Sequence, residues 1–471
     1  MRTGRYEMPV GTFRALARGG GGGEVVRRLL AVPVSRNLLA LRSAVVLATD
    51  LGHPHAPLVN DAWQLLGELR RSAPGPTRVV LGYPTVSVWA AGTLRALGHG
   101  DRGSANDPAT LGAVVAAAAM RAGGRTRVSF PTSPSGAVTV ALPGLGRVHR
   151  GPGGGAGLAE LTVDGARRTL TLDGVPVTGP GLCPRTTGTA GGGPAPAWHP
   201  VPRLRADGHG PRLHLDDLRS LARPAAVAPV DAVRAARWAA RLSPGWRLLA
   251  TRHRRAATEL TEAISMVMPL ARDAAGRPWA AVTSGGTPDE LTAPLISGTF
   301  PAAVGCVALS DGPGAAGPIA AALVHELAHN KLAALDHLFP LVEAAEPARH
   351  PAPWRAGARP LPALVQGLYA HVAVGEFWRR ERRFGTTTGR HLAHAEFARL
   401  RGACREVADL LRTADGLTGY GRLLVDQLDD VVDGWSGRPV GPTVARRAGR
   451  RRPRPAPPRY GARPDSPTDN R

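Results

Sequence analysis

The 471-residue sequence predicts a mixed α+β protein, and three observations support this class. Apolar residues recur at helical spacing in the first 125 residues and again after residue 230. Between these regions, short β-branched runs separated by Gly and Pro are typical of hairpin strands. We therefore expect a helix-rich N-terminal region (1–125), a β-rich middle region (126–230), a mainly helical C-terminal domain (231–435) and a disordered basic tail (436–471).

The N-terminal region predicts helices on either side of a glycine stretch, GGGGG at 19–23, which we expect to be a flexible loop. The runs VVRRLLAVPVSRNLLALRSAVVLA and VNDAWQLLGELRR both place apolar residues at helical spacing. The run RVVLGYP (78–84) predicts a short strand, and a helix follows over Val86–Leu97. The glycine-rich stretches at 151–157 and 191–193 are also expected to be loops, because no strand–GxGxxG–helix pattern surrounds them.

The middle region contains TRVSF, AVTVAL, AELTVDG and RTLTLDGVPV, which predict hairpin strands. Further on, LISGTFPAAVGCVALS (295–310) predicts one or two buried strands, and helices dominate from Ile319 to about Asp433. The tail after residue 436 is rich in Pro and Arg, so it cannot bury a core.

The net charge of +23 does not by itself indicate a nucleic-acid partner. Except in the tail, the arginines are mixed with acidic residues, and the sequence contains no nucleic-acid-binding module. The three cysteines (Cys183, Cys306 and Cys404) are odd in number and widely spaced, which argues against a disulfide framework or a thiolate zinc site. We find no signal peptide and expect no bilayer-spanning stretch. We therefore expect a cytoplasmic protein without a membrane or nucleic-acid partner.

The central motif is HExxH, within AALVHELAHNKLAALDHL. His325 and His329 are four residues apart, so on a helix they lie about 40° apart and one turn above each other. Two imidazoles in this arrangement can bind one metal ion, and Glu326 at the edge of that face is a candidate general base, ligand or neighbouring group. The surrounding leucines predict a buried helix, which rarely holds two histidines and a glutamate without pairing or metal.

The third ligand distinguishes the classes of HExxH protein. One zinc-protease pattern continues to a glycine and a third histidine, but Leu332 and Leu335 occupy those places here. We favour His371, in the apolar segment LVQGLYAHVAVGEFW, as the third ligand. The acidic alternatives are Asp336, Glu343, Glu346 and Glu376.

The sequence contains a single lysine, Lys331, two residues after the motif. On a helix it lies about 200° from His329, so we expect it to point away from the metal. A structural ion pair and anion binding are both consistent with this position.

The chain resembles the HExxH-type peptide β-hydroxylases of bacterial ribosomal-peptide maturation. The resemblance rests on LVHELAHNKLAALDHLFPL and APWRAGARPLPALVQGLYAHVAVGEFWRR, and it extends more weakly over residues 12–435. It implies an iron(II) enzyme that uses 2-oxoglutarate and O₂ to hydroxylate the β-carbon of a residue in a precursor peptide. It also implies a partner peptide made on the ribosome and a radical-SAM maturation enzyme encoded nearby.

Carried over by position, the resemblance makes His325, His329 and His371 the iron ligands and places Glu326 in the active site. It suggests that Arg355 and Arg359 lie near the site, where either guanidinium suits the carboxylates of 2-oxoglutarate. Spacing alone does not name the metal, because imidazole binds iron and zinc alike. Two alternatives therefore stay open: a zinc metallopeptidase with Glu326 as general base, and a non-catalytic partner that binds the precursor peptide.

Overall fold

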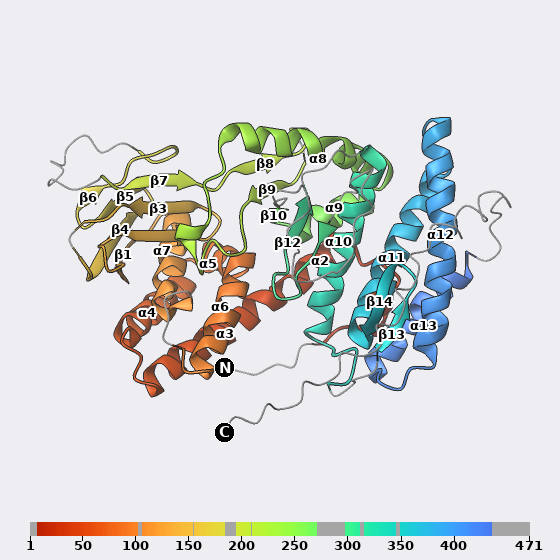
Figure 1. Cartoon of the computed structure of the whole chain (residues 1–471), viewed down its shortest axis with the longest axis horizontal. Coiled ribbons are helices and arrows are strands. Elements are labelled where there is room, and N and C mark those ends of the chain that lie inside the picture. The colour runs from red at the N-terminus through yellow and green to blue at the C-terminus, as the bar shows by residue number, and fades with distance from the viewer. Residues whose placement is uncertain are drawn as a thin grey trace, which may run out of the picture. The chain divides into compact units, whose positions relative to one another are not determined.

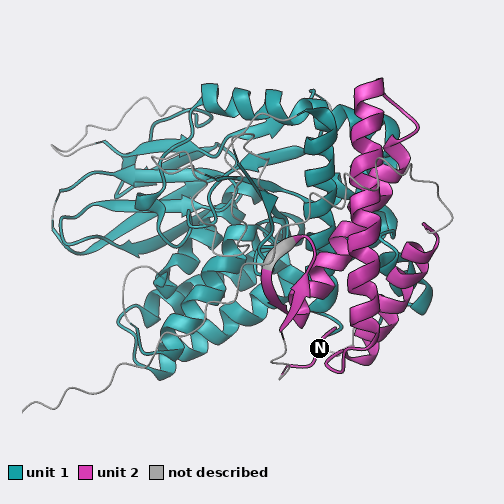
Figure 2. Cartoon of the chain, turned by 45° about the vertical axis from the view of Figure 1, so that its right-hand side comes forward, with its two compact units in different colours: residues 1–284, 288–340 teal, residues 285–287, 341–471 magenta. Residues whose placement is uncertain are grey.

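The computed structural model describes residues 7–101, 106–153, 155–183, 195–208, 210–270, 297–310, 315–344 and 349–435. The chain forms two compact units, with the boundary after Pro340 (Figure 2). Unit 1 contains helices and three sheets, whereas unit 2 is mainly helical with one hairpin. The expected α+β class is confirmed. The HExxH helix belongs to unit 1 and His371 to unit 2. The expected tail (436–471) lies outside the described residues.

Unit 1 begins with a bundle of helices (Figure 1). They are α1 (Val10–Ala17), α2 (Gly22–Leu29), α3 (Ala31–Asp50), α4 (Ala56–Ser72), α5 (Pro74–Leu81), α6 (Pro84–Gly98) and α7 (Leu111–Ala122), with a 3-10 turn, η2 (Pro108–Thr110), before α7. Every residue from Leu111 to Ala119 is buried, so α7 is the central helix of this bundle.

The strand expected at residues 78–84 is wrong, because most of this run lies in helix α5. Pro74 is the first residue of α5, where its fixed φ favours the first helical turn. Val80 and Leu81 are buried in the core. Tertiary packing of these side chains therefore outweighs the β-propensity of the run.

Two antiparallel sheets confirm the hairpin strands expected in the middle region. One has the order β1-β4-β5-β6 and the other β2-β3-β7. In the register, Val128 lies opposite Leu161 and Val140 opposite Val148, which gives apolar cross-strand pairs. The strands are β1 (Arg125–Pro131), β2 (Val138–Leu142), β3 (Gly146–Arg150), β4 (Leu158–Asp164), β5 (Thr169–Leu172), β6 (Val175–Pro176) and β7 (Ala197–Pro200).

A third, mixed sheet positions the HExxH helix. Its order is β11-β12-β10-β9-β8, and β9, β10 and β12 run parallel. The strands are β8 (Arg203–Arg205), β9 (Arg212–Leu215), β10 (Met266–Leu270), β11 (Ser297–Gly298) and β12 (Cys306–Ser310). Helices α8 (Ala232–Arg252) and α9 (Arg254–Ala263) connect β9 to β10, and β12 leads to α10 (Ala316–Asp336).

The mixed sheet is covered on both faces. Met266 and Cys306 are register neighbours that pack into the same apolar core as Trp89 of α6. Side chains alternate along a strand, so Val267 and Val307 face the opposite side. Helices α9 and α10 lie on that opposite side (Figure 1). The HExxH helix and α6 therefore cover different faces of the sheet.

The glycine stretch at 19–23 forms a tight connection between α1 and α2 instead of the expected flexible loop. Gly19, Gly21 and Gly22 have φ values of 76°, 113° and 76°, which L-residues with side chains rarely adopt. A Cβ on Gly23 would lie 2.9 Å from Cγ2 of Thr258 in α9. Glycine is needed here both for the backbone conformation and for close packing of α2 on α9.

Helices α2 and α3 together (Gly22–Asp50) are long and apolar enough to cross a membrane by length and composition. This corrects the expectation that no stretch meets those criteria. In the structure, Leu41 and Val45 of α3 are buried in the core of unit 1.

Unit 2 is a hairpin followed by three helices. The hairpin is β13 (Arg349–Ala352) with β14 (Arg355–Pro360), and the helices are α11 (Leu361–Glu381), α12 (Thr387–Arg412) and α13 (Gly419–Asp433). Trp435 packs so closely on α11 that a Cβ on Gly375 would lie 2.5 Å from its ring. This packing, together with buried Phe397, fixes α11 in the unit 2 core.

Candidate metal centre

Helix α10 brings His325 and His329 together as the motif predicts. Their Nε2 atoms are 3.0 Å apart, and the rings meet edge to face with centroids 4.6 Å apart. Both side chains are half-buried, whereas most of the helix around them is buried. Two imidazole nitrogens this close can bind one ion, since metal–nitrogen bonds are about 2.1 Å long. The pair therefore presents two nitrogen atoms close enough to bind one ion.

Glu326, next to His325 on the same helix, is buried in unit 1. Its side chain is 1% exposed, and Oε2 accepts a hydrogen bond of 2.6 Å from the hydroxyl of Thr299. Thr299 follows β11 in the segment that leads to β12. The carboxylate thus has a neutral hydrogen-bond partner on the side of α10 that packs on the sheet.

Asn330 extends the same buried network. Its Oδ1 accepts from the backbone N–H of Gly305 at 2.6 Å, and its amide donates to the carbonyls of Cys306 at 3.2 Å and Glu326 at 2.9 Å. These bonds attach α10 to the start of β12. Because buried polar groups are costly to leave unpaired, the network fixes the rotation of α10 and hence the direction of the two histidines.

Lys331 forms the structural ion pair that its position allowed. Nζ lies 2.7 Å from Oε2 of Glu259, and it also donates to the carbonyls of Gly19 at 3.1 Å and Gly20 at 2.6 Å. Oε1 of Glu259 accepts from the N–H of Gly22. Burial lowers the pKa of Lys331, and the charge of Glu259 opposes this shift. This ion pair ties α10 to α9 and to the glycine connection before α2.

His371 lies on α11 in unit 2. Its Nδ1 donates to the carbonyl of Gly367 at 2.7 Å, which makes Nε2 the nitrogen with the lone pair in the neutral ring. Trp354 stacks on the imidazole with centroids 4.3 Å apart and planes 18° apart. A Cβ on Gly367 would lie 2.6 Å from this indole, so the glycine makes room for it. A carbonyl that orients the ring in this way is typical of metal-binding histidines.

Arg355 and Arg359 lie on β14, in the same unit as His371. Arg355 pairs with Ala352 across the hairpin and directly follows Trp354, and its side chain lies outside the described part of the structure. Arg359 is half-buried, and burial together with the neighbouring charge of Arg349 lowers its pKa. Two neighbouring guanidinium groups favour the binding of an anion.

The structure thus brings His325, Glu326 and His329 together on one helix of unit 1, whereas His371, Arg355 and Arg359 belong to unit 2. Among the acidic alternatives, Glu376 pairs with Arg379 at 2.7 Å and accepts from the indole of Trp435. Glu343 is exposed, Asp336 is the last residue of α10, and Glu346 lies outside the described residues.

Sequence reasoning missed several residues. Thr299 binds Glu326, Asn330 binds the start of β12, and Trp354 stacks on His371. Thr299 could not be found from the sequence, since only the fold brings it to α10. Sequence reasoning also missed a cluster of His53, His55 and Asp107, whose ligand atoms lie within 4.8 Å of one another. Nδ1 of His55 lies 2.7 Å from Oδ2 of Asp107. The HPH sequence at 53–55 was the available signal for this cluster.

No protein-family model matches the chain, and no curated protein is similar to it.

Proposed function

We propose that the protein hydroxylates the β-carbon of a residue in a ribosomally made precursor peptide, with iron(II) and 2-oxoglutarate as cofactors. His325, His329 and His371 would hold the iron, and Arg355 or Arg359 would bind a carboxylate of 2-oxoglutarate. When bound, these cofactors and O₂ supply the oxidation that inserts one oxygen atom into a C–H bond and yields succinate and CO₂. The protein would act in the cytoplasm, alongside a radical-SAM enzyme that modifies the same peptide.

The observation that carries this proposal is the contrast between the histidines and Glu326. The two imidazole nitrogens lie 3.0 Å apart on a half-buried face, which suits two ligands of one ion. The Glu326 carboxylate is buried and bound by the Thr299 hydroxyl at 2.6 Å. A zinc peptidase needs this glutamate beside a metal-bound water, as general base. A glutamate bound on the sheet side of α10 favours the oxygenase instead.

His371 also supports the proposal. Its hydrogen bond to Gly367 and its stacking on Trp354 hold the ring in one orientation with Nε2 as the acceptor nitrogen. Three imidazoles leave further positions on an iron ion for 2-oxoglutarate and O₂. Arg359 beside Arg349 supplies positive charge in the unit that carries His371.

The test is aerobic incubation of the protein with iron(II), 2-oxoglutarate and the precursor peptide encoded beside its gene. We expect one added oxygen in the peptide by mass spectrometry, with one succinate formed per product. Anaerobic cleavage of the peptide with zinc would support the metallopeptidase and contradict the proposal. Tight peptide binding without any change of mass would support the non-catalytic partner.

A further inference from the structure

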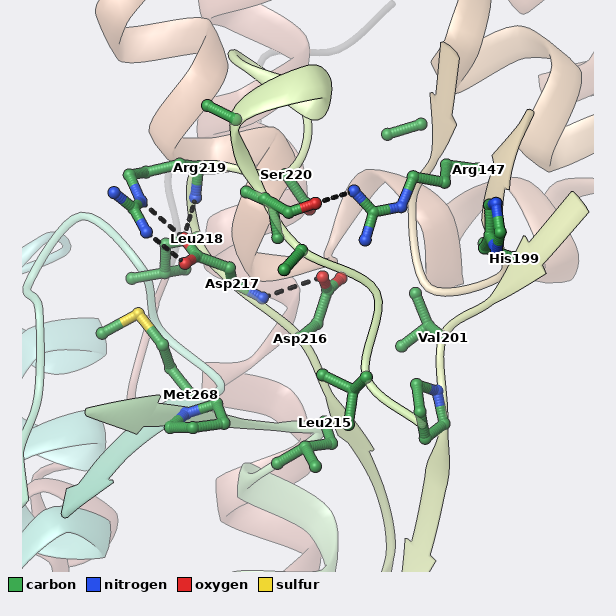
Figure 3. A pocket seen from close by; sticks show the side chains of 18 of the residues that line it. Arg147, His199, Val201, Leu215, Asp216, Asp217, Leu218, Arg219, Ser220 and Met268 are labelled. Carbon is green, nitrogen blue, oxygen red and sulfur yellow. Dashed lines mark hydrogen bonds and ion pairs between the residues drawn. The ribbon is translucent and has the colours of Figure 1, made fainter. Parts of the chain in front are cut away.

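Unit 1 contains a pocket of about 590 Å³ at the carboxyl ends of two parallel strands (Figure 3). Leu215 ends β9 and is followed by Asp216, while Met268 and Leu270 lie in the last part of β10. Crevices outside the carboxyl ends of parallel strands are common ligand sites in α/β sheets. The volume lies within the usual range for small-ligand sites, about 300–1,000 Å³.

This pocket is distinct from the HExxH face of α10. Met268 is two residues after Met266, so both side chains point to the α6 side of the mixed sheet. Val88 of α6 also lines the pocket, whereas none of the described residues of α10 does. A ligand in the pocket would therefore bind on the face of the sheet opposite α10.

An acidic and a basic group, Asp216 and Arg147, both line this pocket. Asp216 is 8% exposed, and its carboxylate accepts from the Tyr83 hydroxyl at 2.9 Å and from the Asp217 N–H at 2.8 Å. Arg147 comes from β3, and its Nη1 donates to the carbonyls of Pro224, at 2.9 Å, and Val227, in the connection that follows Asp216 (Figure 3).

Each of these two groups has its own hydrogen-bond partners. Among the described contacts, no hydrogen bond or ion pair joins Asp216 to Arg147. Asp217 is occupied separately by Arg219 at 2.7 Å. The remaining lining is largely apolar, with Leu142, Val201, Leu218 and Phe300 as examples.

We propose that this pocket binds an extended apolar segment of the substrate peptide, with one peptide group bridging Asp216 and Arg147. A peptide group offers an N–H donor and a C=O acceptor, which match a carboxylate and a guanidinium that line the same pocket. The neighbouring side chains of the segment would fill the apolar lining. The pocket is thus a docking site that holds the peptide apart from the reacting residue, and this role rests on the proposed function.

The test is a binding measurement that needs neither iron nor O₂. The probe is a capped, fluorescein-labelled hexapeptide of alternating leucine and serine, and fluorescence anisotropy measures its binding to the full chain. We expect saturable binding. Ala226→Trp should weaken binding at least about 10-fold because the indole fills the pocket. Arg147→Gln should weaken it at least about 10-fold because it removes the charged donor.

Two matched controls separate the pocket from general damage to the fold. Ala225→Trp adds the same bulk to a neighbouring exposed residue of the same 3-10 turn, η3 (Pro224–Ala226), that does not line the pocket. Arg212→Gln removes an exposed charge on β9 outside the pocket. Both should bind within about twofold of wild type, and circular dichroism should show the same helix content for all four variants.

Equal binding by Ala226→Trp and wild type would overturn the proposal, as would equal weakening by the two controls. Competition by free leucine with no binding of the capped peptide would also overturn it, because the site would then select a small zwitterion. His329→Ala should bind the peptide as wild type does. Loss of hydroxylation with intact peptide binding would count against the iron chemistry alone, whereas hydroxylation without pocket binding would count against the pocket alone.

Discussion

Helices α10 and α11 both carry histidines at candidate metal positions, but different features orient the rings. On α10, His325 and His329 face each other across one turn, and buried polar bonds from Glu326 and Asn330 to the sheet side fix the rotation of the helix. On α11, His371 is oriented by its own helix carbonyl and by a stacked indole. The first arrangement follows from spacing within one helix, whereas the second depends on a glycine and on Trp354 from the hairpin.

The largest expected effect comes from replacing the two histidines of α10. If the proposed function holds, His325→Ala and His329→Ala should each lower hydroxylation by at least about 1,000-fold, because each removes a proposed iron ligand. Glu326→Gln should keep activity within about 10-fold, since a glutamine oxygen still accepts from Thr299. The control is His391→Ala, an exposed histidine of α12. Loss of activity in Glu326→Gln equal to that in His325→Ala would indicate a general base and favour the peptidase.

The anchoring of α10 can be broken without touching the histidines. Lys331→Met removes the closer cation of buried Glu259 and leaves only Arg255, at 3.9 Å, which should lower the free energy of unfolding by about 3–5 kcal/mol. Replacing both residues with Lys331→Met and Glu259→Met should recover much of this loss. Urea denaturation measures the free energy of unfolding of the single and the double variant. The control is Arg399→Met, which breaks a more exposed ion pair and should lower the free energy of unfolding by only about 0–1 kcal/mol. A loss below 1 kcal/mol for Lys331→Met would contradict the buried ion pair.

The stability contributed by Asp216 and His214, on the pocket side of the mixed sheet, should depend on pH. Burial raises the pKa of Asp216 to about 6 from 3.8, so its contribution to stability falls as pH rises from about 4 to 6. Burial lowers the pKa of His214 to about 4 from 6.5, so its contribution rises over about pH 4–6.5. Each shift corresponds to about 3 kcal/mol, and the two oppose each other.

Asp216→Asn should therefore reveal the rise in stability with pH that His214 causes. Between pH 4 and 6.5 the unfolding free energy of this variant should increase more steeply than that of wild type, by up to about 3 kcal/mol. Urea denaturation at several pH values measures the difference. Parallel pH profiles for the two proteins would show that Asp216 does not titrate in this range.

The smallest expected effect tests how His371 is oriented on α11. Gly367→Ala places a methyl group where Trp354 packs, so the His371 ring loses its stacked partner. Loss of such an orienting contact typically costs about 10–100-fold in metal affinity. Gly402→Ala in α12, where a Cβ meets nothing within 4 Å, is the matched control and should stabilise the helix slightly. Equal iron affinity in both variants would show that stacking on Trp354 does not orient His371 for metal binding.

The sequence predicted the parts of this protein that depend on local patterns. The α+β class, the hairpin strands and the HExxH helix follow from periodicity and spacing. The strand expected at 78–84 failed because burial of Val80 and Leu81 decides the conformation of that run. The prediction of a flexible loop at residues 19–23 failed because glycine is needed there for close packing on α9, more than 200 residues away along the chain. Thr299 was missed because only the sheet topology brings it to Glu326.

Iron binding by His371→Ala tests the central claim most directly, because it asks whether His371 completes the ligand set begun by His325 and His329. Wild type and the variant are purified anaerobically, loaded with iron(II), desalted and analysed for metal content. We predict about one iron per chain for wild type, and a loss in His371→Ala as large as that in His329→Ala. Wild-type iron content in His371→Ala would contradict the proposed ligand set.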